Sequence, residues 1–381
     1  MISGALKMEY RTLNTGEKVS LLGLGTMRLP LTEDEKVDEK KAVDLIRSAI
    51  DSGINYIDTA YTYHGGNSEK VLGRALKDGY RDKILLADKM PVWLAKDEEA
   101  MKAMFEKQFE RLDTDSIDMY LVHNITAPIW KRVKKLNLLP FLEEKKAEGR
   151  IKHIGFSFHD RFELFEEVID AFPWEFCQIQ LNYMDKDFQA GVKGLKYATQ
   201  KGLSVIIMEP LKGGRLTTGL PPSVEELFAG ADIKRSPAEW AFKWLAAMPE
   251  VTVMLSGMSS MQQLEANIDI MSKNDLCSLT DKESAMIDKV SDEYNKLIKY
   301  SCTGCQYCMP CPQKLEIPRI IGYYNDWFIY GNPSTENEYR TWIPDGRHAS
   351  DCIACGACEE KCPQSLPIRE AMKRTAELFG I

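Results

Sequence analysis

Long apolar runs are missing from this sequence of 381 residues, which argues against a membrane-spanning helix. No stretch approaches the roughly 20 consecutive apolar residues that cross a bilayer. The opening MISGALKMEYRTLN also lacks the apolar segment of a secretory signal. An excess of positive charge is missing as well, since the formal net charge is -8. We therefore expect a cytoplasmic protein with neither nucleic acid nor a membrane as partner.

Cysteine is scarce over most of the chain and crowded at its end. Of the 10 cysteines, only Cys177 and Cys277 precede residue 300, and the others form two short runs. A disulfide framework is typical of short secreted chains, whereas clustered cysteines in a long chain without a signal favour metal ligation in a reducing compartment. We interpret Cys177 and Cys277 as ordinary buried or surface residues.

The alternation of apolar runs with segments of helical period predicts eight strand–helix units. The expected strands lie at 20–25, 54–58, 84–88, 118–123, 152–156, 176–180, 203–208 and 251–255. The expected helices lie near 38–52, 67–78, 97–112, 138–148, 161–171, 189–200, 237–247 and 260–272. The strand runs are almost continuously apolar, as expected for parallel strands that are covered on both faces.

Two architectures contain such units, a closed (β/α)8 barrel and an open doubly wound sheet. The first glycine-bearing turn, GLGTMRLP, does not match the G-x-G-x-x-G pattern of dinucleotide-binding open sheets. The number of units is typical of the closed barrel. We predict an α/β TIM barrel and keep the open sheet as the alternative.

Four polar residues stand at the ends of three consecutive predicted strands or in the loop after the first of them. In barrel enzymes, the catalytic residues lie at this end of the strands. Asp58 ends INYID, Tyr63 lies in the loop that follows, Lys89 comes after ILLAD, and His123 ends DMYLVH. Each residue alone has a structural interpretation, such as a turn cap, a rim lysine or a packing residue. Their occurrence together at successive strand ends indicates a catalytic site.

These side chains suit the reduction of a carbonyl group. Hydride attack on a carbonyl carbon creates an alkoxide that must be protonated, and a tyrosine can donate that proton although its usual pKa is about 10. A neighbouring ammonium group favours the phenolate and lowers that pKa. A carboxylate holds the ammonium group in place, and a histidine can donate a hydrogen bond to the carbonyl oxygen.

Four segments resemble the aldo-keto reductase family, in the family's order, over roughly residues 8–272. They are NYIDTAYTYHGGNSEKVLGRAL, DMYLVHN, GRIKHIGFSFHD and EPLKGGRL. The resemblance implies a (β/α)8 barrel that binds NADP or NAD in extended form without a Rossmann unit. It also implies that Asp58, Tyr63, Lys89 and His123 are the family's catalytic tetrad, with Tyr63 as the general acid.

The resemblance further implies a set of cofactor-binding residues. They are Thr26, Met27, Ser157, Gln180, Met208, Gly213, Gln263 and Asn267. Met208 stands where an aromatic ring often stacks on the nicotinamide, and Phe158 stands where the family usually has Asn. Ser259 or Ser260 replaces the basic residue that would pair with a 2′-phosphate, so NAD becomes plausible beside NADP. Gly213 fits a plain surface loop as well as a contact with the cofactor's diphosphate.

The two cysteine runs near the end of the chain indicate iron–sulfur clusters. The second run is Cys352, Cys355, Cys358 and Cys362, followed by proline, and it has the ferredoxin-type spacing of a [4Fe–4S] cluster. The first run is Cys302, Cys305, Cys308 and Cys311, with one residue fewer before its last cysteine. Structural zinc and disulfides are the alternatives, but zinc sites usually pair two CxxC motifs across a longer spacer.

By analogy with two-cluster ferredoxins, the last cysteine of each run ligates the other cluster. We therefore expect Cys311 to join Cys352, Cys355 and Cys358, and Cys362 to join the first three cysteines of the first run. The predicted domains are a reductase-like barrel over 1–295 and a small, mainly helical ferredoxin-like domain with two [4Fe–4S] clusters over 296–381.

The predicted function is the NAD(P)H-dependent interconversion of a small aldehyde or ketone and its alcohol. The clusters would exchange electrons with a redox partner protein or support the structure. Two alternatives remain open: a barrel without turnover that serves as a redox sensor or electron-transfer scaffold, and a reductase in which a flavin mediates between cluster and substrate.

Overall fold

The computed structural model describes residues 8–302, 304, 307–362 and 364–381, and these form two compact units. The first unit contains the described residues up to Lys186, together with Ala190–Gly213 and Ala238–Leu279. The second contains Asp187–Gln189, Gly214–Pro237 and the described residues from Thr280 onward. The domain boundary between residues 295 and 296 stays a prediction.

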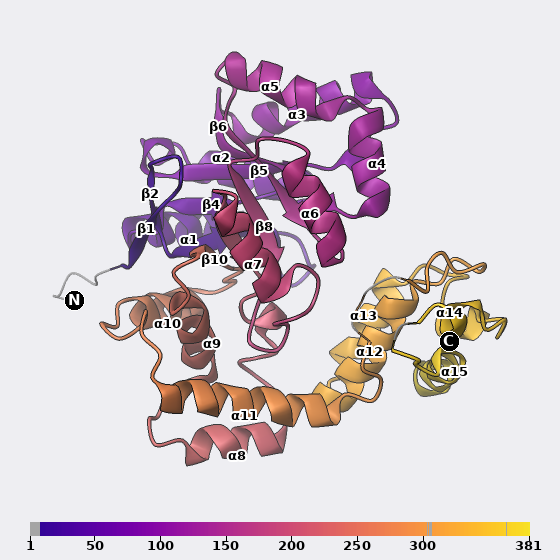
Figure 1. Cartoon of the computed structure of the whole chain (residues 1–381). Helices are drawn as coiled ribbons and strands as arrows, with labels where there is room; N and C mark the ends of the chain where they lie inside the picture. The colour runs from indigo at the N-terminus through magenta and orange to yellow at the C-terminus, as the bar shows by residue number, and fades with distance from the viewer. Residues whose placement is uncertain (1–7, 303, 305–306, 363) are drawn as a thin grey trace. The chain divides into compact units, whose positions relative to one another are not determined.

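Eight parallel strands close into a barrel in the first unit, which confirms the predicted fold class (Figure 1). They are β3 (Leu22–Gly25), β4 (Tyr56–Asp58), β5 (Leu85–Met90), β6 (Ile117–Ile125), β7 (Ile151–Phe158), β8 (Phe176–Gln180), β9 (Ser204–Met208) and β10 (Val251–Ser256). Pairing follows chain order, and β10 closes the ring against β3. The open doubly wound sheet is therefore excluded.

Helices surround the barrel and cover its strands (Figure 1). They are α1 (Glu39–Asp51), α2 (Asn67–Ala75), α3 (Glu98–Leu112), α4 (Ala127–Lys135), α5 (Leu138–Ala147), α6 (Phe162–Asp170), α7 (Gly191–Gln200), α9 (Pro237–Ala246) and α10 (Met261–Met271). In α1, the side chain of Asp38 caps the first turn by accepting from the Lys41 amide. The face with Ala42, Leu45 and Ile46 is buried, as the helical spacing predicts.

Two features of the first unit were not predicted from the sequence. Helix α4 follows β6 directly, in a segment that the sequence left without an element. An antiparallel hairpin of β1 (Tyr10–Thr12) and β2 (Lys18–Ser20) precedes the barrel. Leu13 and Val19 from this hairpin pack into the same core cluster as Tyr56 and Phe176 of the barrel strands.

The second unit is helical. Its elements are α8 (Pro222–Gly230), α11 (Asp281–Leu297), α12 (Ile317–Tyr330), α13 (Ser334–Trp342), α14 (Ala357–Glu360) and α15 (Ile368–Phe379). Helix α8 lies in the connection after β9, which the sequence presented as a long loop. The C-terminal part packs Ile320, Tyr324, Tyr339, Met372 and Phe379 into one core, and its described residues form no strand. No described helix is long and apolar enough to cross a membrane.

Candidate active site and cysteine-lined cavity

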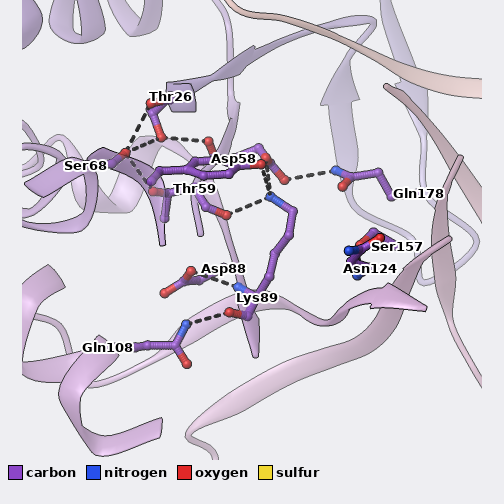
Figure 2. Close-up of polar contacts among 11 residues, drawn as sticks. Thr26, Asp58, Thr59, Ser68, Asp88, Lys89, Gln108, Asn124, Ser157 and Gln178 are labelled. Carbon is purple, nitrogen blue, oxygen red and sulfur yellow. Dashed lines mark hydrogen bonds and ion pairs between the residues drawn. The ribbon is translucent and has the colours of Figure 1, made fainter. Parts of the chain in front are cut away.

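Asp58 and Lys89 form a buried ion pair at the carboxyl end of neighbouring strands β4 and β5 (Figure 2). The Lys89 Nζ donates to Asp58 Oδ1 at 2.5 Å and to the Thr59 carbonyl at 2.7 Å. Burial acts to lower the pKa of Lys89, but the Asp58 carboxylate and, after it, the Tyr63 hydroxyl group outweigh burial and raise the pKa above its ordinary value. The lysine is therefore charged and held in one position.

Tyr63 lies against this ion pair. The Lys89 Nζ is 3.5 Å from the Tyr63 hydroxyl oxygen and 5.0 Å from the centre of its ring. Burial raises the pKa of Tyr63, and the Lys89 ammonium acts in the opposite direction without reversing the shift. The sequence argument gave the direction of the lysine's effect correctly, but the net shift is upward. Tyr63 therefore keeps its proton at neutral pH.

The loop that carries Tyr63 turns through left-handed backbone in the short helical turn Tyr63–Gly66, with φ of 50° at His64 and 89° at Gly66. A Cβ added at Gly66 would lie 2.6 Å from Cζ of Arg111. Glycine is therefore required at this position, because it allows both the backbone conformation and the close approach of the guanidinium.

His123 lies near the end of β6, with its ring centre 6.2 Å from that of Tyr63 and 5.0 Å from that of Trp93. Burial and the positive charge of Lys89 hold the pKa of His123 well below its ordinary value, so the ring is neutral. Its Nδ1 is buried and has no hydrogen-bond partner within the described part of the chain. A buried nitrogen without a hydrogen-bond partner destabilises the folded protein unless a ligand supplies the missing bond. This fits a position of His123 beside a bound substrate or cofactor.

The residues assigned to the nicotinamide end of the cofactor lie at strand ends of the same barrel. The Thr26 hydroxyl donates to the Asp58 carbonyl at 2.9 Å, and the Ser157 hydroxyl oxygen accepts from the Asn124 amide at 2.7 Å (Figure 2). Gln180 and Met208 are paired across β8 and β9. Met27 is exposed, and so is Gly213, assigned from the sequence to the cofactor's diphosphate.

The residues assigned to the adenine end lie at the start of α10. The Ser260 hydroxyl caps this helix by accepting from the Gln263 amide at 3.3 Å. The Gln263 side-chain oxygen accepts from the Ser259 amide at 2.8 Å, and buried Asn267 donates to Ser256 at 3.1 Å. The two serines therefore stand at the helix N-terminus, where backbone amides favour an anion.

The second unit contains a cavity that is lined by cysteines of both runs. Cys308 and Cys311 of the first run line it together with Cys352, Cys355 and Cys358 of the second. Cys302 and Cys362 are partly buried against the helical core of this unit, while Cys305 lies outside the described residues. No three Cys, His, Asp or Glu side chains of the described residues stand at a spacing suited to a metal ion. The shared cavity, rather than a preformed ligand set, is what fits a cluster here.

Cys177 and Cys277 take no part in this cavity. Cys177 is buried in β8, where burial raises the pKa of its thiol far above the ordinary value, and Cys277 is exposed. Both match the expectation of ordinary buried or surface residues.

Comparison with known proteins agrees with both parts of the chain. Residues 21–292 match the model of the Aldo/keto reductase family, and residues 301–366 match the model of a 4Fe-4S dicluster domain. The chain belongs to the aldo/keto reductase family. Its barrel is thus that of an NAD(P)-dependent oxidoreductase, and an iron–sulfur domain follows it.

Individual relatives support this membership. The chain is 31% identical over 242 residues to an aldo-keto reductase from Bacillus subtilis (strain 168), which covers 60% of this chain and 69% of the relative. It is 29% identical over 289 residues to L-galactose dehydrogenase from Arabidopsis thaliana, with 69% and 88% covered.

Solved structures of the family resemble the barrel. An aldo-keto reductase from Bacillus halodurans, in its holo form, matches with a TM-score of 0.62 at 27% identity and covers 74% of this chain and 96% of its own. One from Klebsiella pneumoniae in complex with NADPH matches with a TM-score of 0.60 at 25% identity, with 75% and 95% covered.

Sequence reasoning missed two side chains in the reductase site. Gln178 donates to the second carboxylate oxygen of Asp58 at 3.0 Å, so this carboxylate is held from both sides (Figure 2). The sequence feature that could have identified Gln178 is its position as a polar residue in the middle of the apolar strand FCQIQ. Trp93, in the turn after β5, packs against His123. A tryptophan in a loop offers no spacing signal of that contact.

A second group of buried charges lies behind Lys89. Glu69 and Asp88 are both fully buried, and Glu69 Oε1 and Asp88 Oδ2 have no hydrogen-bond partner among the described residues. Arg111 donates to Glu69 at 2.6 Å, and the Lys89 amide donates to Asp88 at 2.8 Å. Burial, with the charge of Glu69 added, raises the pKa of Asp88 well above its ordinary value. Asp88 therefore takes up a proton at a higher pH than an ordinary aspartate does.

Proposed function

We propose that the barrel interconverts a small aldehyde or ketone and its alcohol, with NADPH or NADH as the hydride carrier. The supporting observation is the position of Lys89 between a buried carboxylate and the hydroxyl of Tyr63. This arrangement places a protonated tyrosine beside a fixed positive charge, which is the pair of groups that carbonyl reduction needs. An intact site of this kind favours an enzyme over a barrel that only binds.

In this proposal, a bound nicotinamide supplies the hydride that reaches the carbonyl carbon. His123, in its neutral form, donates a hydrogen bond to the carbonyl oxygen and orients it. Tyr63 transfers its hydroxyl proton to the same oxygen as the C–O double bond becomes a single bond. The phenolate that remains is stabilised by the Lys89 ammonium 3.5 Å away, and it takes a proton from water before the next turnover.

Thr26, Met27, Ser157, Gln180 and Met208 are proposed to surround the nicotinamide. Gly213, Gln263 and Asn267 are proposed to follow the rest of the cofactor. The Klebsiella pneumoniae relative, solved with NADPH, favours NADPH. The lack of a basic side chain at Ser259 and Ser260 favours NADH, and fluorescence titration with both nucleotides distinguishes them.

For the second unit we propose two [4Fe–4S] clusters, which supply one-electron redox chemistry when bound. Cys311, Cys352, Cys355 and Cys358 would hold one, and all four line the same cavity, as Cys308 does too. Cys302, Cys305, Cys308 and Cys362 would hold the other. In a cytoplasmic setting, these clusters would exchange electrons with a redox partner protein.

Substitution of Tyr63 by Phe tests the barrel proposal. Tyr63→Phe removes the proton donor and should lower kcat for simple aldehydes by about 10²–10⁴-fold, because general acid catalysis contributes roughly that factor. NADPH affinity should stay within about twofold. Tyr197→Phe is the matched control, since this surface hydroxyl donates only to Asp170 on the outside of the barrel. Full carbonyl reduction by Tyr63→Phe would contradict the proposal.

Iron and acid-labile sulfide, measured on anaerobically purified protein, test the cluster proposal. About eight iron atoms per chain are expected for two [4Fe–4S] clusters. Zinc in place of iron would contradict it. The visible spectrum of the same sample would also reveal a bound flavin, which would favour the flavin-mediated alternative.

A further inference from the structure

A cationic side chain stands at the cysteine-lined cavity of the second unit. Arg369, in the first turn of α15, lines the cavity together with a second cation, Lys361, and with Cys308, Cys311, Cys352, Cys355 and Cys358. Its guanidinium is close to the loop between the last two of these cysteines, because a Cβ added at Gly356 would lie 3.8 Å from the Arg369 Cζ. The charge therefore stands beside the backbone that presents the thiolates.

Glu359 fixes the position of this guanidinium. One carboxylate oxygen of Glu359 accepts from the Arg369 amide at 2.8 Å, and the other accepts from its Nε at 2.8 Å. Glu359 itself follows Cys358 directly, in the short helix α14. The arginine is thus attached at two points to the same segment that carries the second cysteine run, although its side chain stays about half exposed.

Arg369 is not explained by the fold alone. An exposed ion pair contributes little to stability, and a charge that only served solubility would not need a guanidinium held by Glu359 next to the cysteines. A [4Fe–4S] cluster with four thiolates is an anion, and its reduction adds one more negative charge. A positive charge held nearby stabilises the reduced form more than the oxidised form.

We propose that Arg369 raises the reduction potential of the cluster bound by Cys311, Cys352, Cys355 and Cys358, and that Glu359 sets how strongly it does so. The proposal rests on the proposed function, because it requires that cluster. The electron enters or leaves the cluster without making or breaking a bond, and the arginine keeps its charge throughout. Arg369 is thus a tuning residue and not a cluster ligand.

The test is a redox titration of the full-length, anaerobically purified protein, with dithionite as reductant and the EPR signal of each reduced cluster as readout. Cys355→Ser, which alters one ligand, assigns the signal of the second-run cluster. Arg369→Gln should shift the potential of that cluster to a more negative value and leave the other cluster unchanged. Glu359→Gln, which removes the opposing negative charge, should shift it to a more positive value.

Two further variants complete the design. Arg369→Lys keeps the charge and the backbone hydrogen bond to Glu359 but loses the bond from Nε, so its shift should be smaller than that of Arg369→Gln. Arg374→Gln is the matched control, since Arg374 lies on the same helix, pairs with Glu370 at 2.7 Å and does not line the cavity. It should leave both potentials unchanged.

The outcomes separate the two proposals. Wild-type protein without iron would overturn the proposed cluster and, with it, the role of Arg369. Iron-loaded Arg369→Gln with an unchanged potential would overturn the role of Arg369, as would equal shifts at both clusters. If Arg369→Gln does not retain iron, the Glu359→Gln variant is used in its place. A shift of the cluster's reduction potential to a more positive value would support the inference, and an unchanged potential would overturn it.

Discussion

The two units of the chain prepare their sites in different ways. In the barrel, Lys89 is already bound to Asp58 and Thr59 and lies beside Tyr63, so the reacting groups are positioned by folding alone. In the second unit, cysteines from both runs line one cavity, but no three ligand side chains of the described residues have metal-binding spacing. Folding alone therefore positions the side chains of the barrel site, whereas in the second unit we expect the bound cluster to bring its ligands together.

Removal of the clusters should have the largest effect on this comparison. Because the free energy of metal binding becomes free energy of folding when no site is preformed, treatment with an oxidant and a chelator should abolish the thermal transition of the second unit. The barrel transition should keep its Tm within a few degrees. Scanning calorimetry, with a tryptophan fluorescence melt beside it, measures both, and survival of two unchanged transitions would contradict the comparison.

Substitution of Lys89 should have a smaller but substantial effect, confined to the barrel. Lys89→Met leaves the buried Asp58 carboxylate without its partner and should destabilise the barrel by about 3–5 kcal/mol. The double variant Asp58→Asn with Lys89→Met should recover much of that loss, because neither charge remains. Exposed Lys102→Met is the control. Equal urea midpoints for Lys89→Met and wild type would show that the ion pair is not what holds this site.

Substitution of the buried Asp88 should have the smallest effect, and this effect depends on pH. Since the folded-state pKa of Asp88 is raised, its contribution to stability is fully present below the ordinary pKa of an aspartate and is lost as pH rises through the raised value. Asp88→Asn keeps an oxygen for the Lys89 amide and needs no proton.

We therefore expect Asp88→Asn to gain stability over wild type as pH rises, by about 1–3 kcal/mol at alkaline pH. Urea unfolding at a series of pH values measures this difference. Exposed Asp115→Asn should show no such trend. A constant difference between Asp88→Asn and wild type at all pH values would mean that the pKa of Asp88 is not raised in the folded protein.

Much of the barrel could be predicted from the sequence, because every buried parallel strand is an apolar run and each helix shows its own period. Helices α4 and α8 escaped prediction although each has proline in its first turn. Both lie in connections outside the one-strand, one-helix alternation on which the prediction is based. The β1–β2 hairpin has strands of 3 residues, too short for a visible alternation.

The site shows the same division. Asp58, Lys89 and His123 could be located because strand ends can be read from the pattern of apolar residues. The hydrogen bond from Gln178 to Asp58 could not, since it connects β8 to β4 across the barrel. Trp93 and the Glu69–Asp88 pair depend on side-chain positions outside the strand pattern. Spacing in a sequence predicts which residues share an edge, but not which of them touch.

The route of the backbone through the two units has a practical consequence. Because the connection between β9 and α9 supplies Gly214–Pro237 to the second unit, that unit is assembled from separate stretches of chain. A protease that cleaves after Leu279 would release a fragment without α8, and a gene fusion that borrowed only the C-terminal hundred or so residues would inherit the same gap. The second unit therefore requires residues from within the barrel sequence as well as those that follow it.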